Sequence, residues 1–306
     1  MKMQRVACSI CGSIDYVPLV QAKDYRLRTT KNVFDLVRCI RCGSVFMNPR
    51  PAEEEFAKFY PEAFYAEPGL ISKFVSDFLT MLKYREVSHF KKTGRILDVG
   101  CGGGGLLFGF KTRGWRTFGV DTSERACRLA ERTTGGKIFN CALKVCIFPD
   151  KYFDVVVLNH VIEHMSFPNK ELAEINRILK NDGIIFVHTP NIDSYQFEVT
   201  GGKWLHLDVP RHLIFYSPNT ISLLLRNVGL EVANIKYPFF DFPFDFYLSL
   251  KQKIASKYST VNFILSPVLR VISLIVKLLP AWRGSMVVTA VKKSSITHTS
   301  EGVPSS

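Results

Sequence analysis

From residue 94 onward the chain alternates between two spacings of apolar residues. Short apolar runs, typical of buried strands, are separated by stretches in which apolar residues recur every three or four positions, as in amphipathic helices. The predicted strands include Ile96–Val99, Thr117–Val120, Val155–Leu158, Ile184–His188, Val232–Lys236 and Met286–Val291. The predicted helices include Leu106–Phe110, Ser123–Thr133, Lys170–Leu179 and Thr220–Val228. Because crossover helices between parallel strands produce this alternation, the pattern predicts an α/β fold around a seven-stranded, mostly parallel sheet.

Four regions follow from the same patterning. Cysteine pairs mark a small N-terminal module, and helical spacing marks a linker or lid. The α/β domain follows, and its last two strands are separated by a long apolar insertion. A Ser/Thr-rich, poorly apolar tail is predicted to be disordered. The predicted bounds are 1–50 for the module, 51–93 for the linker, 94–292 for the domain with its insertion at 237–283, and 293–306 for the tail.

The first strand of the domain ends directly in a run of glycines, and a helix is predicted immediately after it. Glycine lets the backbone approach a ligand closely, and the helix N-terminus offers free N–H donors. The spacing of Gly100, Gly102 and Gly105, with Asp121 further along, also fits a dinucleotide-binding loop. The glycines therefore predict a nucleoside site without choosing its ligand.

Asp98 favours one ligand over the other. It stands just before the glycines, where a dinucleotide would place its pyrophosphate, and a carboxylate there would repel that group. S-adenosylmethionine (SAM) carries an ammonium and a sulfonium and no phosphate, so the same carboxylate attracts it. The acidic pair Asp98 and Asp121 thus predicts SAM as the cofactor.

These segments resemble the class I SAM-dependent methyltransferases. The matching segments are Leu97–Gly105, Gly119–Ser123, Phe153–His164, Leu179–Gly183 and Thr189–Asn191, within a region of roughly 90–235. Within that superfamily the chain is similar to the small-molecule branch of ubiquinone-type and sugar methyltransferases. The resemblance implies a Rossmann-like domain that binds SAM.

The resemblance also assigns roles to single residues. It implies that Gly100, Gly102 and Gly104 line the methionine part of SAM, that Asp98 holds its amino group and that Asp121 holds its ribose. Asn159, after the fourth strand, is a further cofactor-binding candidate. The chain departs from its relatives after the third strand, where they place an acidic residue for adenine. The stretch 139–143 has no carboxylate, so Asn140 or backbone groups would take that role.

A first polar cluster, His160, Glu163 and His164, follows the fourth strand. In ubiquinone-type relatives an acidic residue precedes such a Glu-His pair, and the cluster is linked to a divalent metal. His160 replaces the acid here. A divalent metal near these three residues is one interpretation; support of the SAM loop and of a helix start is the other.

A second cluster spans 204–212, after the fifth strand. We expect Trp204, Asp208 and Arg211 to bind the acceptor, with Arg211 gripping a carboxylate or phosphate. A hydroxyl acceptor must lose a proton, and histidine titrates near neutral pH. The candidate bases are His160, His206 and His212. The alternative is a polar loop that only hydrogen-bonds to itself.

Two CxxC pairs lie in the N-terminal module, and a glycine follows each second cysteine. Four thiolates at this spacing are typical of a closed, structural zinc site, whereas a redox dithiol would need only one pair. We therefore predict that zinc is bound by Cys8, Cys11, Cys39 and Cys42. The other four cysteines are interpreted as packing residues, as expected in a reducing cytoplasm. The N-terminus shows no signal-peptide pattern.

The formal net charge is +13. Such an excess favours an anionic partner: a nucleic acid, an acidic membrane surface or a phosphate-bearing substrate. A solvated basic surface without a partner is the alternative. The charge thus narrows the class of partner without naming one.

The insertion is rich in phenylalanine, and Ser266-Pro267 predicts the start of a helix that ends at Pro280. Polar residues at 259, 266, 270, 273 and 277 form a narrow stripe on this otherwise apolar helix. The helix is too short to span a bilayer. It could lie on the inner face of a membrane with its basic residues near headgroups. A lid packed on the core and a homodimer contact are the alternatives.

Together these features predict a cytoplasmic SAM-dependent methyltransferase. The expected acceptor is a small molecule, a sugar or a lipid-linked compound, methylated on oxygen. The zinc module and the basic charge leave an RNA methyltransferase as the alternative, and a non-catalytic protein that keeps the fold as a third. RNA binding would weaken steeply with salt.

Overall fold

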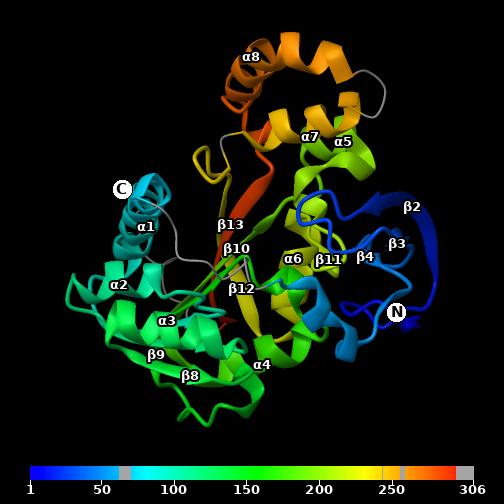
Figure 1. Cartoon of the computed structure of the whole chain (residues 1–306). Coiled ribbons are helices and arrows are strands. Elements are labelled where there is room, and N and C mark those ends of the chain that lie inside the picture. Colours follow the sequence, from blue (N-terminus) through cyan, green and yellow to red (C-terminus); the bar gives the residue numbers. More distant parts are fainter. Residues whose placement is uncertain (62–69, 243, 256–258, 294–306) are drawn as a thin grey trace, which may run out of the picture.

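The computed structural model describes residues 1–61, 70–242, 244–255 and 259–293. Its centre is a seven-stranded sheet with the order β12-β13-β10-β9-β6-β7-β8 (Figure 1). Strands β6 to β10 run parallel, and β13 is antiparallel to both of its neighbours. The strands are β6 (Arg95–Val99), β7 (Arg116–Asp121), β8 (Lys137–Asn140), β9 (Phe153–Asn159), β10 (Leu179–Pro190), β12 (Leu230–Lys236) and β13 (Ser285–Lys292). The predicted α/β fold is confirmed.

Helices cover this sheet because its central strands are apolar on both faces. In β9, for example, Val155, Val156 and Leu158 are fully buried. The helices flanking the sheet are α1 (Leu70–Phe90), α2 (Gly105–Lys111), α3 (Glu124–Thr134), α4 (Pro168–Ile178) and α6 (Pro218–Asn227). Ser123 caps α3 by accepting the Ala126 N–H, so the helix begins at the next residue, Glu124.

The carboxyl ends of parallel strands share one edge of a sheet, where α/β proteins bind ligands. The glycine loop follows β6, Asp121 ends β7, and His160 follows β9. The sheet topology therefore brings the predicted cofactor residues together.

The N-terminal residues form a second, four-stranded antiparallel sheet with the order β11-β4-β3-β2. Its strands are β2 (Tyr16–Lys23), β3 (Val33–Cys39), β4 (Val45–Met47) and β11 (Ile214–Phe215). β1 (Met3–Gln4) pairs with β5 (Arg50–Pro51), and the short helix η1 (Glu53–Phe59) follows. Because β11 comes from the later part of the chain, the N-terminal module is joined to the large domain through backbone hydrogen bonds.

The insertion forms a helical hairpin of α7 (Asp245–Ala255) and α8 (Ser259–Val276), beside α5 (Tyr195–Thr200) (Figure 1). The prediction that a helix starts at Ser266-Pro267 was wrong, because α8 begins earlier and holds Pro267 inside. Among the helices of the described ranges, none combines the length and hydropathy needed to cross a bilayer. The predicted tail lies almost wholly outside the described residues.

One further difference concerns the remaining cysteines. Cys141 and Cys146 form a disulfide, whereas both were expected to be packing residues. Cys101 and Cys127 are free and buried, as expected of packing residues. The bridge closes a tight loop after β8, a contact that the spacing of five residues did not suggest.

Candidate active site

A cavity of about 1390 Å³ lies along the carboxyl edge of the central strands. Residues after β6, β7 and β8 line what we call its cofactor side: the glycine loop, Asp121–Ser123 and Cys141–Leu143. Residues after β9 and from later loops line its acceptor side: His160, Val161, His164, Met165, Leu205, His206, Asp208, Arg211, His212 and Phe242. Because β9 lies next to β6 in the sheet, the acceptor side begins beside the glycine loop of the cofactor side.

The glycine loop needs its glycines for both conformation and space. Gly100, Gly102 and Gly104 all have positive φ angles, between 51° and 78°. A Cβ at Gly100 would lie 2.5 Å from a methyl group of Val161, and a Cβ at Gly104 would lie 3.0 Å from the Cα of Ala130. L-residues rarely adopt such angles, so conformation and space both exclude a side chain at Gly100 and Gly104. At Gly102, where a Cβ would meet no atom within 4 Å, conformation alone does so.

Asp121 is fixed within the loop that it closes. Its carboxylate accepts the backbone N–H groups of Gly102 at 2.9 Å and of Ser123 at 2.8 Å, and the residue lines the cavity. Asn140 instead donates its amide to the Asp121 carbonyl, so the expected adenine partner is engaged elsewhere. Cys141–Leu143 line this part of the cavity in its place.

Asp98 is buried beneath the loop with 3% of its surface exposed. Its Oδ1 has no hydrogen-bond partner among the described residues. Burial raises the pKa of this carboxyl to about 7, although Lys83 opposes the rise. A buried carboxyl with a free oxygen beside a glycine loop fits a cationic ligand such as the SAM ammonium.

Lys83 from α1 and His188 from β10 hold Asn159 at the cavity wall. Lys83 Nζ lies 2.5 Å and His188 Nδ1 lies 3.2 Å from Asn159 Oδ1. The side-chain oxygen of Asn159 is therefore engaged, which leaves its amide N–H groups to face a ligand.

His160 lies between two carboxylates. Its Nδ1 is 3.2 Å from Glu163 and its Nε2 is 3.3 Å from Asp241, a residue of the insertion. Burial alone would lower the pKa of His160, but these carboxylates outweigh it and raise the pKa to about 9. His160 is thus an imidazolium near neutral pH, a fixed charge or an acid rather than the base that the sequence suggested.

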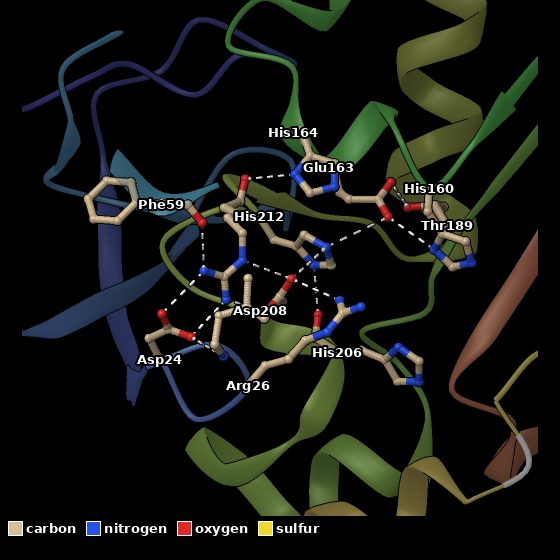
Figure 2. Close-up of polar contacts among 12 residues, drawn as sticks. Asp24, Arg26, Phe59, His160, Glu163, His164, Thr189, His206, Asp208 and His212 are labelled. Carbon is tan, nitrogen blue, oxygen red and sulfur yellow. Dashed lines mark hydrogen bonds and ion pairs between the residues drawn. The ribbon is translucent and has the colours of Figure 1, made fainter. Parts of the chain in front are cut away.

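Glu163, His164 and His212 converge from two loops (Figure 2), with one ligand atom from each lying within 4.8 Å of the others. His164 Nδ1 is 3.0 Å from the Arg211 carbonyl, and His212 Nδ1 is 2.8 Å from the His206 carbonyl. A carbonyl only accepts, so each Nδ1 carries the proton and each Nε2 keeps a lone pair.

The charges of this trio suit a cation. Burial lowers the pKa of His164, and burial together with His164 lowers the pKa of His212 to about 3. Burial would raise the pKa of Glu163, but His160 outweighs it and holds the pKa at about 2. Two neutral imidazoles and one carboxylate are a common donor set for divalent transition metals.

His206 has a different partner. Its Nε2 lies 3.1 Å from Asp245, the first residue of α7, and its ring packs on Phe242 with ring centroids 5.2 Å apart. No other described residue forms a hydrogen bond with its Nδ1, and His206 lines the cavity. A carboxylate that orients an imidazole is the arrangement found in general-base pairs.

Arg211 is fully buried and its guanidinium is engaged. It bonds to Asp24 at 2.7 Å, to Asp208 at 2.6 Å and to the Phe59 carbonyl at 3.3 Å. Figure 2 shows Asp24, from the N-terminal part of the chain, approaching the loop that carries Asp208. Arg211 therefore positions the loop, whereas the sequence had suggested that it grips the acceptor.

Arg26 is the more accessible cation of this cluster. It lies 3.1 Å from Asp208, lines the cavity and keeps 44% of its side chain exposed. Asp208 thus holds two arginines, one buried and one at the cavity surface. Trp204, also predicted to bind the acceptor, is 2% exposed, belongs to the apolar cluster around Phe34 and is not among the residues lining the cavity.

The four predicted zinc ligands form one cluster. Their sulfur atoms all lie within 4.8 Å of one another, and two pairs are 3.5 Å apart. Gly12 and Gly43 have nearly equal φ angles, 76° and 75°, and each donates its N–H to the carbonyl of the cysteine four residues before it. A tetrahedral zinc with Zn–S bonds of about 2.3 Å spaces its sulfurs by roughly 3.8 Å, so the cluster fits this ion.

Sequence patterns missed several residues of the site. Lys83, Asp24, Asp241 and Asp245 all make buried contacts to predicted residues. The three aspartates lie 39 to 187 positions away in sequence from the residues that they bind on the acceptor side. Lys83 lies on α1, outside the predicted α/β domain. The only available signal was an acidic residue within an apolar stretch, as at Asp241 and Asp245.

The sequence family described as "Methyltransferase domain" matches residues 69–235. A ubiquinone biosynthesis O-methyltransferase of Azoarcus sp. (strain BH72) is 30% identical over 154 residues, covering 46% of this chain and 66% of that protein. One from Paraburkholderia phymatum is 30% identical over 162 residues, covering 49% and 70%. The chain thus spans about two thirds of the length of these relatives.

A SAM-dependent methyltransferase structure from Archaeoglobus fulgidus superimposes with a TM-score of 0.50 at 21% identity, covering 71% of this chain and 94% of that one. At this identity the likeness concerns the fold. The sequence match extends over more than half of the chain, including the glycine loop, Asp121 and the Glu163-His164 pair. The chain therefore belongs to the class I SAM-dependent methyltransferase family.

Proposed function

We propose that this enzyme transfers the methyl group of SAM to an oxygen of a small-molecule acceptor, such as a sugar, a quinone-like compound or a lipid-linked compound. The observation that carries the proposal is the His206–Asp245 pair on the acceptor side of a cavity whose other side carries the glycine loop. The ubiquinone O-methyltransferases among its relatives support an oxygen acceptor.

On the cofactor side, Asp98 and Asp121 would bind the ammonium and the ribose of SAM, with Gly100, Gly102 and Gly104 along its methionine part. SAM bound in this way would place its methyl carbon toward the acceptor side. Alignment of the two reactants is the main task of the protein, because the transfer is an in-line displacement.

On the acceptor side, His206 would take the proton of the acceptor hydroxyl while Asp245 stabilises the imidazolium that forms. The oxygen then attacks the methyl carbon, and the electrons of the C–S bond return to sulfur. The sulfonium charge disappears in this step, so a cavity that excludes water favours it.

Glu163, His164 and His212 would hold a divalent cation, which lowers the pKa of a hydroxyl bound to it. Two features support this assignment: both imidazoles are neutral, and each donates its other N–H to a backbone carbonyl. In this proposal His212 takes the place of His160 in the predicted ligand set of His160, Glu163 and His164, because Asp241 holds His160.

Arg26 would bind an anionic group on the acceptor. It is the cation at the acceptor side whose donors are not all spent on protein carboxylates. The four cysteines would bind zinc and fix the N-terminal sheet, which supplies Asp24 and Arg26 to the site.

The test of the reaction is His206→Gln, assayed with SAM and a cell extract as the source of acceptor. The product is detected by mass spectrometry as a gain of one CH₂ unit. We expect turnover to fall by about 10²–10⁴-fold, the usual contribution of a general base, while SAM affinity stays unchanged. His89→Gln, an exposed histidine on α1, is the matched control. Full turnover by the His206 variant would refute the proposed base.

The two metal assignments are tested by elemental analysis. We expect zinc in the purified protein to be lost in Cys39→Ser, and added Mn²⁺ to bind a second site that His212→Ala removes. Retention of zinc by Cys39→Ser, or unchanged Mn²⁺ binding by His212→Ala, would exclude the respective site.

A further inference from the structure

Helix α8 turns its polar residues toward the protein. Ser273 and Lys277 are 0% and 1% exposed. Ser273 accepts the Tyr247 N–H at 3.1 Å, and Lys277 bonds to Asp245 at 3.2 Å. Ser266 adds a hydrogen bond to the Tyr247 hydroxyl at 2.7 Å. Three members of the polar stripe, Ser266, Ser273 and Lys277, therefore pack α8 onto α7, whereas Arg270 stays exposed.

The opposite face of α8 is apolar and exposed. Val268, Val271 and Ile275 are 54%, 56% and 57% exposed, and Ile272 is 40% exposed. These positions follow the i, i+3, i+4, i+7 spacing of one helix face. Leu278 and Leu279, just beyond the helix, continue it at 65% and 60%. A helix normally buries such a face, so this continuous apolar surface indicates a site that contacts a membrane or another molecule.

The exposed charged side chains of the α7–α8 hairpin, among its described residues, are basic. The sequence contains no aspartate or glutamate between Asp245 and Glu301, while it contains eight lysines and arginines there. Lys251, Lys253 and Arg270 are exposed on the α7–α8 hairpin. Basic residues beside an apolar helix face match a bilayer surface that carries anionic headgroups.

The same charge disfavours a second copy of the chain. In a two-fold dimer, the identical face of the partner would bring its own lysines and arginines against these. Like charges across an interface repel, whereas anionic headgroups neutralise them. The one-signed charge therefore selects the bilayer as the occupant of this face.

The hairpin stands at the outer end of the molecule, with α7 between α8 and the body (Figure 1). Its base reaches the active site: Phe242 lines the cavity, and Asp245 bonds both His206 and Lys277. We infer that the exposed apolar face of α8 docks on an anionic lipid bilayer and so holds the acceptor side of the cavity near the headgroups. The docking stands apart from methyl transfer, whereas a lipid-linked acceptor would rest on the proposed function.

The test is flotation of the full-length protein with vesicles of phosphatidylcholine alone or with one quarter phosphatidylglycerol. We expect binding to the anionic vesicles, weaker binding at high salt, and at least about tenfold weaker partitioning for the double variant Val271→Asp/Ile275→Asp. Both side chains are more than half exposed, so the substitutions leave the fold intact. Ile147→Asp, at a fully exposed isoleucine after β8, is the matched control and should bind as the unaltered chain does.

Two measurements keep the outcomes distinct. SAM titration of each variant reports the cofactor site, so a loss of vesicle binding with normal SAM affinity concerns docking alone. Sedimentation analysis without lipid reports self-association. The inference is overturned if the protein ignores both vesicle types, if the double variant still floats, or if it sediments as a dimer that the double variant dissociates.

Discussion

On the cofactor side of the cavity, each of the three loop segments ends or directly follows a strand of the central sheet, within 44 consecutive positions from Gly100 to Leu143. On the acceptor side, the segments come from the N-terminal sheet, the loops after β9 and β10, and the insertion. The first side is built from backbone groups and glycines. The second is built from buried side chains that bind one another across up to 187 positions.

This difference shows how the two reactants, SAM and the acceptor, would be bound. SAM is common to the whole family, and its proposed site combines the glycine loop with the carboxylates of Asp98 and Asp121. The acceptor side depends instead on buried side chains that come from distant segments of the chain. Arg211 is the clearest case, because it ties the N-terminal Asp24 to the Asp208 loop.

The largest effect that separates the two sides should come from Arg211→Met. The substitution leaves Asp24 and Asp208 buried without their partner, and such unpaired charges cost about 3–5 kcal/mol of unfolding free energy. Urea denaturation measures the loss. Arg128→Met removes an exposed pair with Glu124 and should change the unfolding free energy by no more than about 0.5 kcal/mol. Equal effects of the two variants would mean that the buried network is not a link between the modules.

The second test strikes the cofactor side alone. In Gly100→Ala, the new methyl group collides with Val161, and SAM affinity should fall at least about tenfold, since an alanine at positive φ already costs roughly 1–2 kcal/mol. Gly102→Ala, in the same loop, has a positive φ of 51° but meets no atom within 4 Å, so it isolates the backbone strain. Calorimetric titration compares both variants. If they bind SAM equally, the close packing of the loop is not what shapes the site.

The third prediction concerns pH. Asp98 has a raised pKa of about 7 in the empty site, and the SAM ammonium favours its charged form. Binding then releases a proton below pH 7, so affinity should weaken by about tenfold for each pH unit as the pH falls from 7. Asp98→Asn should bind SAM weakly and with little pH dependence. The same slope in both proteins would assign the titration to another group.

For the same reason, the empty enzyme should be less stable at pH 8 than at pH 5 through Asp98. Its folded pKa lies above the unfolded value, so the folded state binds the proton more tightly, and stability falls as the pH rises from about 4 to 7. Asp98→Asn should remove this part of the pH dependence. Thermal unfolding at the two pH values measures it, and an undiminished dependence in the variant would contradict the assignment.

The smallest effect is expected for Arg26→Ala. Loss of one charge-assisted hydrogen bond to an anionic acceptor should raise KM for that acceptor by about tenfold, with SAM affinity unchanged. Arg125→Ala, on α3, is the control variant. A neutral acceptor would be indicated if KM did not change.

The elements that sequence patterns predicted well are those with strong local signals. Most strands of the central sheet, the glycine loop and the start of α3 were predicted to within about two residues, because buried runs, glycines and a serine cap act locally. The exceptions are β10, which begins five residues before its predicted start, and β8, which was not among the named strands. The predicted start of α8 failed because proline at 267 fits a first turn as well as a helix interior that can do without one N–H. Nothing local chose between the two.

For the site, the residue types were predictable and their tasks were not. His160, Trp204 and Arg211 stand where polar or aromatic chemistry was expected, yet distant residues give each a different role. Asp241 stabilises the protonated form of His160, an apolar cluster buries Trp204, and Asp24 accepts hydrogen bonds from Arg211. Those roles depend on contacts that sequence spacing does not contain.

The amino-acid sequence by itself determined the fold class, the cofactor loop and the four-cysteine cluster, because each rests on hydrophobic periodicity or on residues a few positions apart. Tertiary structure alone decided which histidine is charged, which keeps a free lone pair, and which face of α8 meets the outside. Protonation and exposure depend on neighbours in space, and in this chain those neighbours arrive from the N-terminal sheet and the insertion.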